Sequence, residues 1–170
     1  MWIQNDLKWD KNISEISIKT NRRLYMLRML TKFGFNTQEL VAVYKGYIRP
    51  LLEYADSVWH SSLSVKQSKT LEQFQRRACR IILGWNFSSY SEALKTCELE
   101  TLSDRRENHC LRFAEGLSNI SRTSDLLLPV RGVAHARNLR SANKLSTFFT
   151  RTSRFQNSPI PFFTSLLNGK

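Results

Sequence analysis

Residues 64–84 read SVKQSKTLEQFQRRACRIILG, and this stretch decides the fold class. At about 100° per residue, its apolar side chains gather on one side of a helix and its basic side chains on the other. The apolar side consists of Leu71, Phe74, Ala78, Ile81 and Ile82. The polar side consists of Lys66, Lys69, Gln73, Arg76, Arg77 and Arg80. Ser64 and Gln67 have the spacing of a capping box, and Gly84 suits the end of a helix, so the stretch predicts a two-faced helix.

Two further helices are predicted before this stretch, from apolar residues at three- and four-residue steps. The first lies between Asp10 and Gly34 and has the apolar set Ile13, Ile16, Thr20, Leu24, Leu27 and Leu30. The second is capped by Asn36 with Glu39 and has the apolar set Leu40, Val43, Tyr47, Leu51, Ala55 and Val58, supported by Tyr44, Ile48 and Trp59. Because Pro50 lacks a backbone donor and clashes with the preceding turn, we expect a kink or break near Arg49.

Helical signals continue after Gly84. Ser89 and Glu92 have the capping spacing ahead of a short helix through about Cys97. A longer helix is predicted from about Ser103 to Leu117, with Leu102, Arg106, Cys110, Phe113 and Leu117 along one side. Since no alternating strand pattern competes, we predict an all-α fold. We expect residues 1–84 to form a three-helix bundle, residues 85–118 a helical extension, and residues 119–170 an irregular basic tail.

The tail differs in composition from the rest of the chain. It holds eight basic residues and one acid, together with Pro129, Pro159 and Pro161. It also contains apolar clusters, at Leu126–Leu128, Phe148–Phe149 and Phe162–Phe163. Such clusters argue against a free solvated arm, so we expect irregular segments that dock on a surface either within this chain or missing from it.

The charge balance favours polyanionic partners. Lys and Arg number 26 against 14 Asp and Glu, which gives a formal net charge of +12. Residues 1–84 carry +7 (14 minus 7), residues 85–118 carry −2 (4 minus 6) and residues 119–170 carry +7 (8 minus 1). Such an excess suits nucleic acid or an anionic membrane surface, with a solubilising surface or an acidic protein partner as alternatives. Nucleic acid is the preferred interpretation.

The sequence offers no constellation for catalysis. Polymerases and nucleases need clustered carboxylates, but no two acids are adjacent here and Asp-x-Asp does not occur. Glu53 and Asp56 are expected to pair with Arg49 or Lys45 at helical spacing. There is no glycine-rich phosphate loop and no glycine-flanked nucleophile. We therefore expect no enzymatic activity, no cofactor and no small-molecule substrate.

Metal binding and membrane insertion are not expected either. The three cysteines (Cys79, Cys97 and Cys110) lack paired spacing, and His109 with Cys97 and Cys110 makes three ligands where a closed zinc site needs four. We expect reduced, mostly buried thiols in an intracellular protein, nuclear or cytoplasmic. Residues 1–6 do not read as a signal peptide, and no apolar stretch approaches the length of a bilayer span.

The candidate binding residues are the cations of residues 64–84 and of the tail. Lys69, Arg76 and Arg80 form a stripe one helix long that could follow a sugar–phosphate backbone. Apart from Glu72 the stripe is single-signed, and the dense apolar side opposite would hold it rigid. The alternative is a merely solvated face. The full set is Lys66, Lys69, Arg76, Arg77, Arg80, Arg131, Arg137 and Arg140.

Residues 47–60, YIRPLLEYADSVWH, resemble a segment of non-LTR (LINE-type, jockey-like) retrotransposon reverse transcriptases. In that family the segment lies just beyond the catalytic palm, in the thumb. Similar likenesses occur upstream at LKWDKNI (7–13) and NRRL (21–24), and downstream at LEQFQRRA (71–78), RIILG (80–84), LSDRR (102–106) and RFQNSPIP (154–161). The resemblance covers nearly the whole chain and is most specific in its centre.

The resemblance implies a thumb-like bundle that grips template–primer duplex as a non-catalytic part of an RNA-directed DNA polymerase. The metal-binding carboxylates of the family lie upstream of this region, so no catalytic residue carries over. The implied partners are an RNA–DNA hybrid or structured RNA, and a palm domain of the same polyprotein. Two alternatives stay open. One is a protein–protein docking module with little nucleic-acid affinity alone, and the other is a domesticated nucleic-acid-binding regulatory protein.

Overall fold

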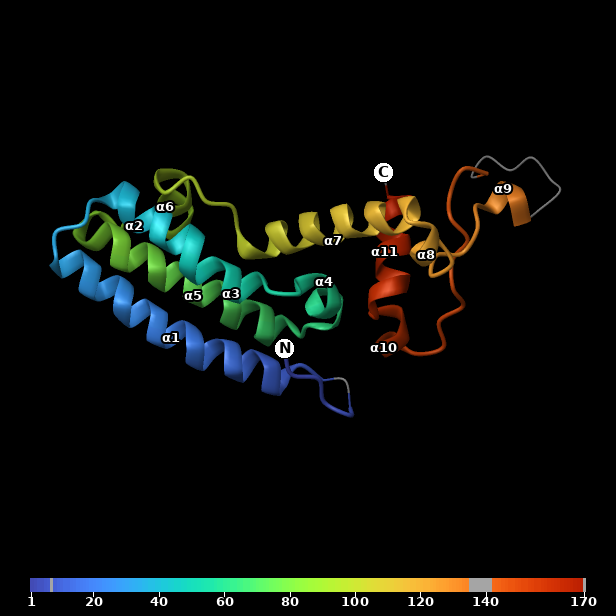
Figure 1. Cartoon of the computed structure of the whole chain (residues 1–170), viewed down its shortest axis with the longest axis horizontal. Helices are drawn as coiled ribbons and strands as arrows, with labels where there is room; N and C mark the ends of the chain where they lie inside the picture. Colours follow the sequence, from blue (N-terminus) through green and yellow to red (C-terminus); the bar gives the residue numbers. More distant parts are fainter. Residues whose placement is uncertain (7, 135–141, 170) are drawn as a thin grey trace. The chain divides into compact units, whose positions relative to one another are not determined.

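The computed structural model describes residues 1–6, 8–134 and 142–169, and within this part the chain is all-α (Figure 1). The β pairing in the described residues is a single antiparallel bridge between Val130 and Leu145. The predicted all-α fold is therefore confirmed. No helix in these ranges is long and apolar enough to cross a membrane. The chain divides into two compact units, one of residues 1–55 and 63–105 and the other of residues 56–62 and 106–170.

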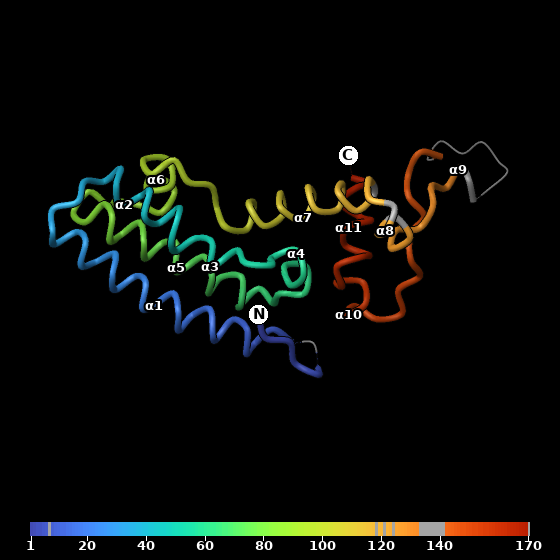
Figure 2. Tube along the Cα trace, viewed as in Figure 1, coloured from blue at the N-terminus to red at the C-terminus, as the bar shows by residue number. Residues whose placement is uncertain are grey.

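The first unit contains the three-helix bundle. Its elements are α1 (Asp10–Lys32), α2 (Thr37–Val43), the π-helical turn η1 (Tyr44–Ile48), α3 (Arg49–Glu53), α5 (Val65–Leu83), the 3-10 turn η3 (Gly84–Asn86) and α6 (Tyr90–Thr96). Helices α1 and α5 pack side by side and run in the same direction (Figure 2). The side chain of Gln67 donates to Asp10 at 2.7 Å near the start of both helices, and that of Arg77 donates to Asn21 at 2.9 Å further along.

The predicted apolar sides of α1 and α5 face the core of this bundle. In the second helical segment only Leu40 of the main predicted set is buried, and the other buried positions there include the supporting residues Tyr44 and Ile48 together with Leu52. Fully buried side chains come from all three helical segments: Leu24, Leu27, Leu40, Tyr44, Ile48, Leu52, Leu71 and Ala78. Phe74 and Ile82 are also buried, whereas Ile81 is only half-buried. The orientation of α5 is therefore as predicted, apart from Ile81 at the edge of the apolar side.

The predicted helix ends are confirmed by their hydrogen bonds. Asn36 and Glu39 exchange both bonds of a capping box, each at 2.9 Å. Ser64 and Gln67 do the same at 2.9 and 3.2 Å. Gly84 has a φ of +53°, a conformation that side chains disfavour, and it terminates α5. These local signals place α5 within one residue of its predicted bounds.

Pro50 is accommodated without a break at Arg49. The wide turn η1 precedes it, and Pro50 lies in the first turn of α3, where its missing N–H costs nothing. The break comes later, because Tyr54 leaves the helical region with ψ 120° and Ala55 has φ +55°. The predicted continuous apolar side through Val58 is therefore wrong, and Tyr47 and Val58 are exposed by 44% and 39%.

The second unit contains α4 (Asp56–Trp59), the 3-10 turn η2 (His60–Ser62), most of α7 (Leu102–Asn119), α8 (Ser121–Ser124), α9 (Arg131–Ala134), α10 (Ser153–Gln156) and α11 (Pro159–Asn168). Its core joins α7 to the tail through Cys110, Ala114, Leu117, Leu127 and Phe163. The tail thus docks through Leu127 and Phe163 of its apolar clusters, whereas Phe149 is 85% exposed. The predicted irregular character of the tail is wrong for α11, a ten-residue helix with Pro159 in its first turn.

Candidate nucleic-acid interface

The exposed side of α5 carries five of the predicted binding residues. Its exposed side chains are Lys66, Lys69, Gln73, Arg76, Arg77 and Arg80, which we call the basic face. In the described part of the chain, none of its five cations forms an ion pair with a carboxylate. Phosphate oxygens could therefore approach these cations without first displacing an acid.

Glu72, the acid that interrupts the pattern in the sequence, is half-buried at the edge of the basic face. Its carboxylate accepts a hydrogen bond from the backbone N–H of Leu102 at 3.1 Å and another from the Tyr90 hydroxyl. These bonds lie inside the first unit and satisfy the charge there. The basic face is therefore more uniformly positive in the fold than the linear sequence indicates.

Aromatic rings support the three arginines of the basic face. The guanidinium carbon of Arg76 lies 5.4 Å from the ring centre of Tyr90, and that of Arg80 lies 5.1 Å from Phe87. Arg77 lies 5.8 Å from the ring of Phe74 and also donates to Asn21. Cation–π contacts restrict long side chains, so less freedom is lost when they bind a phosphate.

Two of these aromatic rings, Phe87 and Tyr90, were not predicted from the sequence as neighbours of the arginines. Phe87 and Tyr90 follow Gly84, and the turn η3 brings them back beside the last turns of α5. Helix periodicity does not indicate that the chain after η3 packs against the last turns of α5. An aromatic residue directly after a capping serine, as in Ser89–Tyr90, is too common a pattern to have indicated it.

Helix α1 extends the basic surface. Asn21 borders the basic face through Arg77, and Arg28 lies two helical turns later on the same side of α1. Arg28 is exposed, so we add it to the candidate interface. Its position could not be inferred without knowing that α1 and α5 are neighbouring parallel helices.

The tail arginines are placed only in part. Arg131 begins α9 in the second unit, where it is half-buried, and its backbone N–H donates to the carbonyl of Lys144 at 2.8 Å. Arg137 and Arg140 lie outside the described residues. A binding site formed by the tail therefore stays a prediction.

A buried polar network holds α5 in position. The Gln75 side chain is fully buried, accepts from the Tyr44 hydroxyl at 2.6 Å and donates to the Tyr90 hydroxyl at 3.0 Å and the Glu100 carbonyl at 2.8 Å. Burial raises the pKa of both Tyr44 and Tyr90, so the two phenols stay protonated donors. Because every partner is satisfied, the network fixes one rotation of α5 and with it the direction of the basic face.

The acids expected to pair at helical spacing have longer-range partners. Glu53 pairs with Arg49 at 3.9 Å, as predicted, but more closely with Arg105 at 2.6 Å. The prediction for Asp56 is wrong, because its carboxylate lies 2.6 Å from Nδ1 of His109. Within the described ranges, no group of three or more His, Cys, Asp or Glu residues could hold a metal ion.

The second unit contains a buried cation, Arg106. Arg106 is fully buried, its guanidinium carbon lies 5.9 Å from the Trp59 ring, and its Nε donates to Nδ1 of His60 at 3.4 Å. Burial and then the charge of Arg106 lower the pKa of His60 from 6.5 to about 4. A neutral His60 is therefore part of the folded state at neutral pH.

The lowered pKa of His60 predicts a loss of stability in mild acid. Below pH 6.5 the unfolded chain protonates this imidazole, whereas the folded chain resists protonation down to about pH 4. The contribution of His60 to the free energy of unfolding should therefore fall as the pH is lowered from 6.5 to about 4, and stay constant below pH 4. We expect the urea midpoint of the parent to fall more than that of His60→Gln between pH 7 and 4, since the carboxylates titrate alike in both proteins. Parallel curves for the two proteins would contradict this assignment.

Comparisons with protein-family models, curated proteins and solved structures found no match to this chain.

Proposed function

We propose that this chain grips nucleic-acid duplex through its phosphate backbone. The observation that carries the proposal is the basic face of α5, where five exposed cations share one side of a helix with no acid among them. Successive cations along a helix match a run of phosphates, and contacts to phosphate carry no sequence information. The expected ligand is an RNA–DNA hybrid or structured RNA, bound without sequence preference.

The biological setting that we propose is the non-catalytic C-terminal part of a non-LTR reverse transcriptase. The support is the resemblance of residues 47–60 and of the segments on both sides to the thumb region of that family. An all-α bundle whose third helix presents a charged side is compatible with a thumb. In this role the chain has no polymerase activity alone, because the carboxylates that bind the catalytic metals would lie on a separate palm.

A specific observation favours protein docking as the second candidate. Three large apolar side chains are exposed where α1 and α5 end, namely Phe33 by 73%, Phe35 by 42% and Trp85 by 104%. Exposed apolar groups of this size often mark an interface with another protein. In that case the partner would be the palm of the same polyprotein, and the affinity for nucleic acid alone would be low.

Replacing Lys69, Arg76 and Arg80 together by glutamine tests the proposal. We expect the affinity for two unrelated hybrid duplexes to fall by a similar factor, roughly tenfold or more, because each side chain loses a phosphate contact. The plot of log affinity against log salt should also flatten, by up to about 0.9 for each lost contact. Fluorescence anisotropy at several salt concentrations measures both quantities, and circular dichroism checks the fold.

The matched control replaces Lys8, Lys19 and Arg22 by glutamine. These exposed cations lie outside the basic face, and their loss changes the net charge by the same amount. The control should keep the parental salt dependence. Equal losses in both variants would mean that only the net charge matters. An unchanged slope in the folded Lys69, Arg76 and Arg80 variant would favour the docking alternative.

A further inference from the structure

A pocket of the first unit lies between residues 1–6, α1 and the end of α3, and the proposed function does not use it. Its volume is about 280 Å³, and its lining includes Trp2, Asn12, Glu15, Leu51 and Tyr54. At about 100° per residue, its α1 residues lie on the opposite side of that helix from Asp10 and Asn21, which contact α5. The pocket is therefore separate from the basic face.

Residues 1–6 are held against the first turns of α1 (Figure 1). The backbone N–H of Trp2 donates to Oδ1 of Asn12 at 3.1 Å. The backbone N–H of Lys11 donates to the Gln4 side chain at 3.0 Å, and Nζ of Lys11 lies 4.3 Å from the centre of the Trp2 ring. These contacts fix Trp2 beside the pocket, although this residue is 49% exposed.

The Asn12 side chain contains a hydrogen-bond donor without a partner. Asn12 is 2% exposed, and no described residue accepts a hydrogen bond from its Nδ2. Because Oδ1 accepts from the N–H of Trp2, the oxygen and nitrogen of this amide cannot be exchanged, and the NH₂ group is the unpaired one. A buried donor without an acceptor lowers the stability of the folded chain. An acceptor atom on a ligand would remove that cost.

Glu15 lies one helical turn after Asn12 and lines the same pocket. It is half-buried, and its carboxylate forms no ion pair with a described residue, although Lys11 and Lys19 lie four positions away on either side. Lys19 also lines the pocket. The pocket thus combines an unpaired amide donor with two carboxylate oxygens that accept hydrogen bonds.

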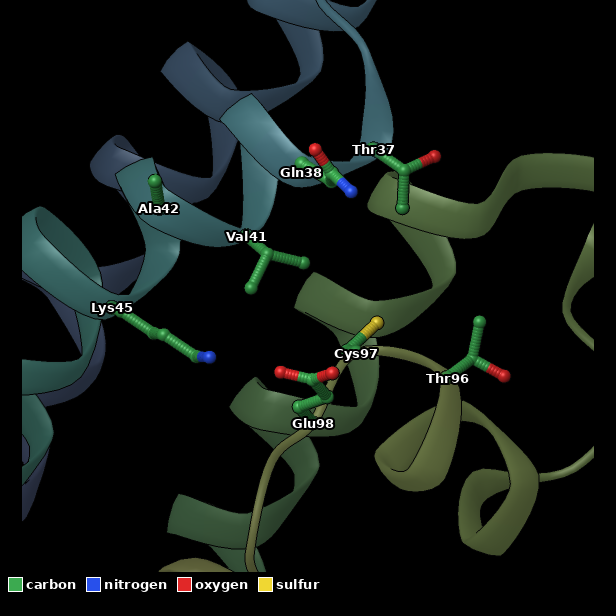
Figure 3. A pocket seen from close by; sticks show the side chains of 8 residues that line it. All are labelled: Thr37, Gln38, Val41, Ala42, Lys45, Thr96, Cys97 and Glu98. Atoms are coloured by element: carbon green, nitrogen blue, oxygen red, sulfur yellow. The ribbon is translucent and has the colours of Figure 1, made fainter.

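Two aromatic rings complete the pocket, those of Trp2 and of Tyr54, which is 64% exposed. Exposed aromatic rings are platforms on which nucleobases stack. A pocket of similar volume, about 290 Å³, lies between α2 and the end of α6 and includes Lys45 and Glu98 (Figure 3). None of the side chains that line it is aromatic. Of these two pockets, the one beside α1 is therefore suited to a base.

We propose that the pocket beside α1 binds an unpaired guanine base. One edge of guanine presents two adjacent donors, N1–H and the N2 amine, beside the acceptor O6. A carboxylate such as that of Glu15 accepts from both donors, the Asn12 amide donates to O6, and the base stacks on an aromatic ring. Adenine, cytosine and uracil lack two adjacent donors on this edge. The base belongs either to a free nucleotide or to an unpaired position in a strand.

Calorimetric titration with nucleoside monophosphates tests this base preference. Guanosine monophosphate should bind roughly tenfold more tightly than the adenosine, cytidine and uridine monophosphates, since only guanine satisfies both carboxylate oxygens. Inosine monophosphate lacks the N2 amine and should fall between the guanosine and adenosine compounds. A water molecule as the only acceptor for Asn12 would give no preference among the bases.

Fluorescence anisotropy with short uridine strands, with and without one guanine, separates the two sources of the base. Tighter binding of the guanine-containing strand than of guanosine monophosphate would identify an unpaired position in a strand. Equal affinities would identify the free nucleotide. Absence of a guanine preference in both titrations would overturn the proposal.

Two variants have matched controls. Glu15→Gln should remove most of the preference for guanine, whereas Glu98→Gln, the same change in the pocket of Figure 3, should keep it. Trp2→Ala should weaken the binding of all bases by a similar factor, roughly tenfold, through the loss of stacking. Trp85→Ala removes a ring outside the pocket that is 104% exposed, and should leave the affinity unchanged.

The fate of this proposal is distinguishable from that of the duplex proposal. Because the pocket lies across α1 from the basic face, the variant with Lys69, Arg76 and Arg80 replaced by glutamine should keep the guanine preference. Circular dichroism checks that each variant is folded, as expected for exposed and half-buried positions. Equal effects of Glu15→Gln and Glu98→Gln, or of Trp2→Ala and Trp85→Ala, would contradict the assignment to this pocket.

Discussion

Replacing Phe74 by alanine is expected to lower the free energy of unfolding by about 3–5 kcal/mol. The ring is 6% exposed, lies on the apolar side of α5 and packs into the core between α5 and its neighbours. Truncation removes the whole ring from this core and leaves a cavity that rigid helices fill only in part. Arg77 also loses the ring on which its guanidinium lies.

Ile81→Ala is the matched control for this variant. Periodicity assigns Ile81 to the same apolar side, but the side chain is only half-buried in the fold. Its truncation should therefore cost less, about 1–2 kcal/mol. Urea unfolding followed by circular dichroism compares the two variants. Equal costs, or a larger cost for Ile81→Ala, would mean that α5 is rotated about its axis, with Ile81 and not Phe74 facing the core.

Local features of the fold were predictable from the sequence, because their causes lie within a few residues. The capping pairs Asn36–Glu39 and Ser64–Gln67 each involve groups three positions apart, and Gly84 ends α5 through its own backbone conformation. The division of α5 into an apolar and a basic side also follows from residue order alone. The basic face, which is the part of the candidate interface on α5, could therefore be predicted from the sequence.

Features that depend on distant partners could not be predicted in this way. The break at Tyr54 and Ala55 separates segments that packing assigns to different compact units, and no glycine marks it in the sequence. Asp56 finds its partner His109 from a distance of 53 residues in the chain. Phe87 and Tyr90 reach the arginines of α5 only because the chain turns back at η3. Periodicity describes single elements and contains no information on which elements become neighbours.

Arg106 in the second unit is a fully buried cation. Helical spacing placed it on the apolar side of its helix with Cys110 and Leu117, and the structure confirms that placement. On the same side Phe113 was also expected to be buried, but it is 49% exposed. Burying a charged group is costly unless it finds polar or aromatic partners, and here the guanidinium lies on Trp59 and its Nε donates to His60.

Arg106→Ala is expected to lower the free energy of unfolding by about 3–5 kcal/mol, because truncating a large, fully buried side chain leaves a cavity. Arg106→Met keeps most of the volume but none of the donors, so it separates packing from hydrogen bonding. A stability close to the parent for Arg106→Met, with a large loss for Arg106→Ala, would assign the cost to packing. Large losses in both would assign it to the polar contacts. A loss below about 0.5 kcal/mol in Arg106→Ala would contradict the burial of this side chain.

The pH dependence of Arg106→Met gives an independent check. The charge of Arg106 contributes to the lowered pKa of His60, so its removal should let that pKa rise from about 4 toward 6.5. The gap between the folded and unfolded values then narrows, and the fall in stability between pH 7 and 4 should become smaller than in the parent. Urea midpoints across this range measure the difference. Burial is the larger cause of the lowered pKa of His60. Part of the loss of stability that His60 causes should therefore remain in Arg106→Met, and this part should be absent from His60→Gln.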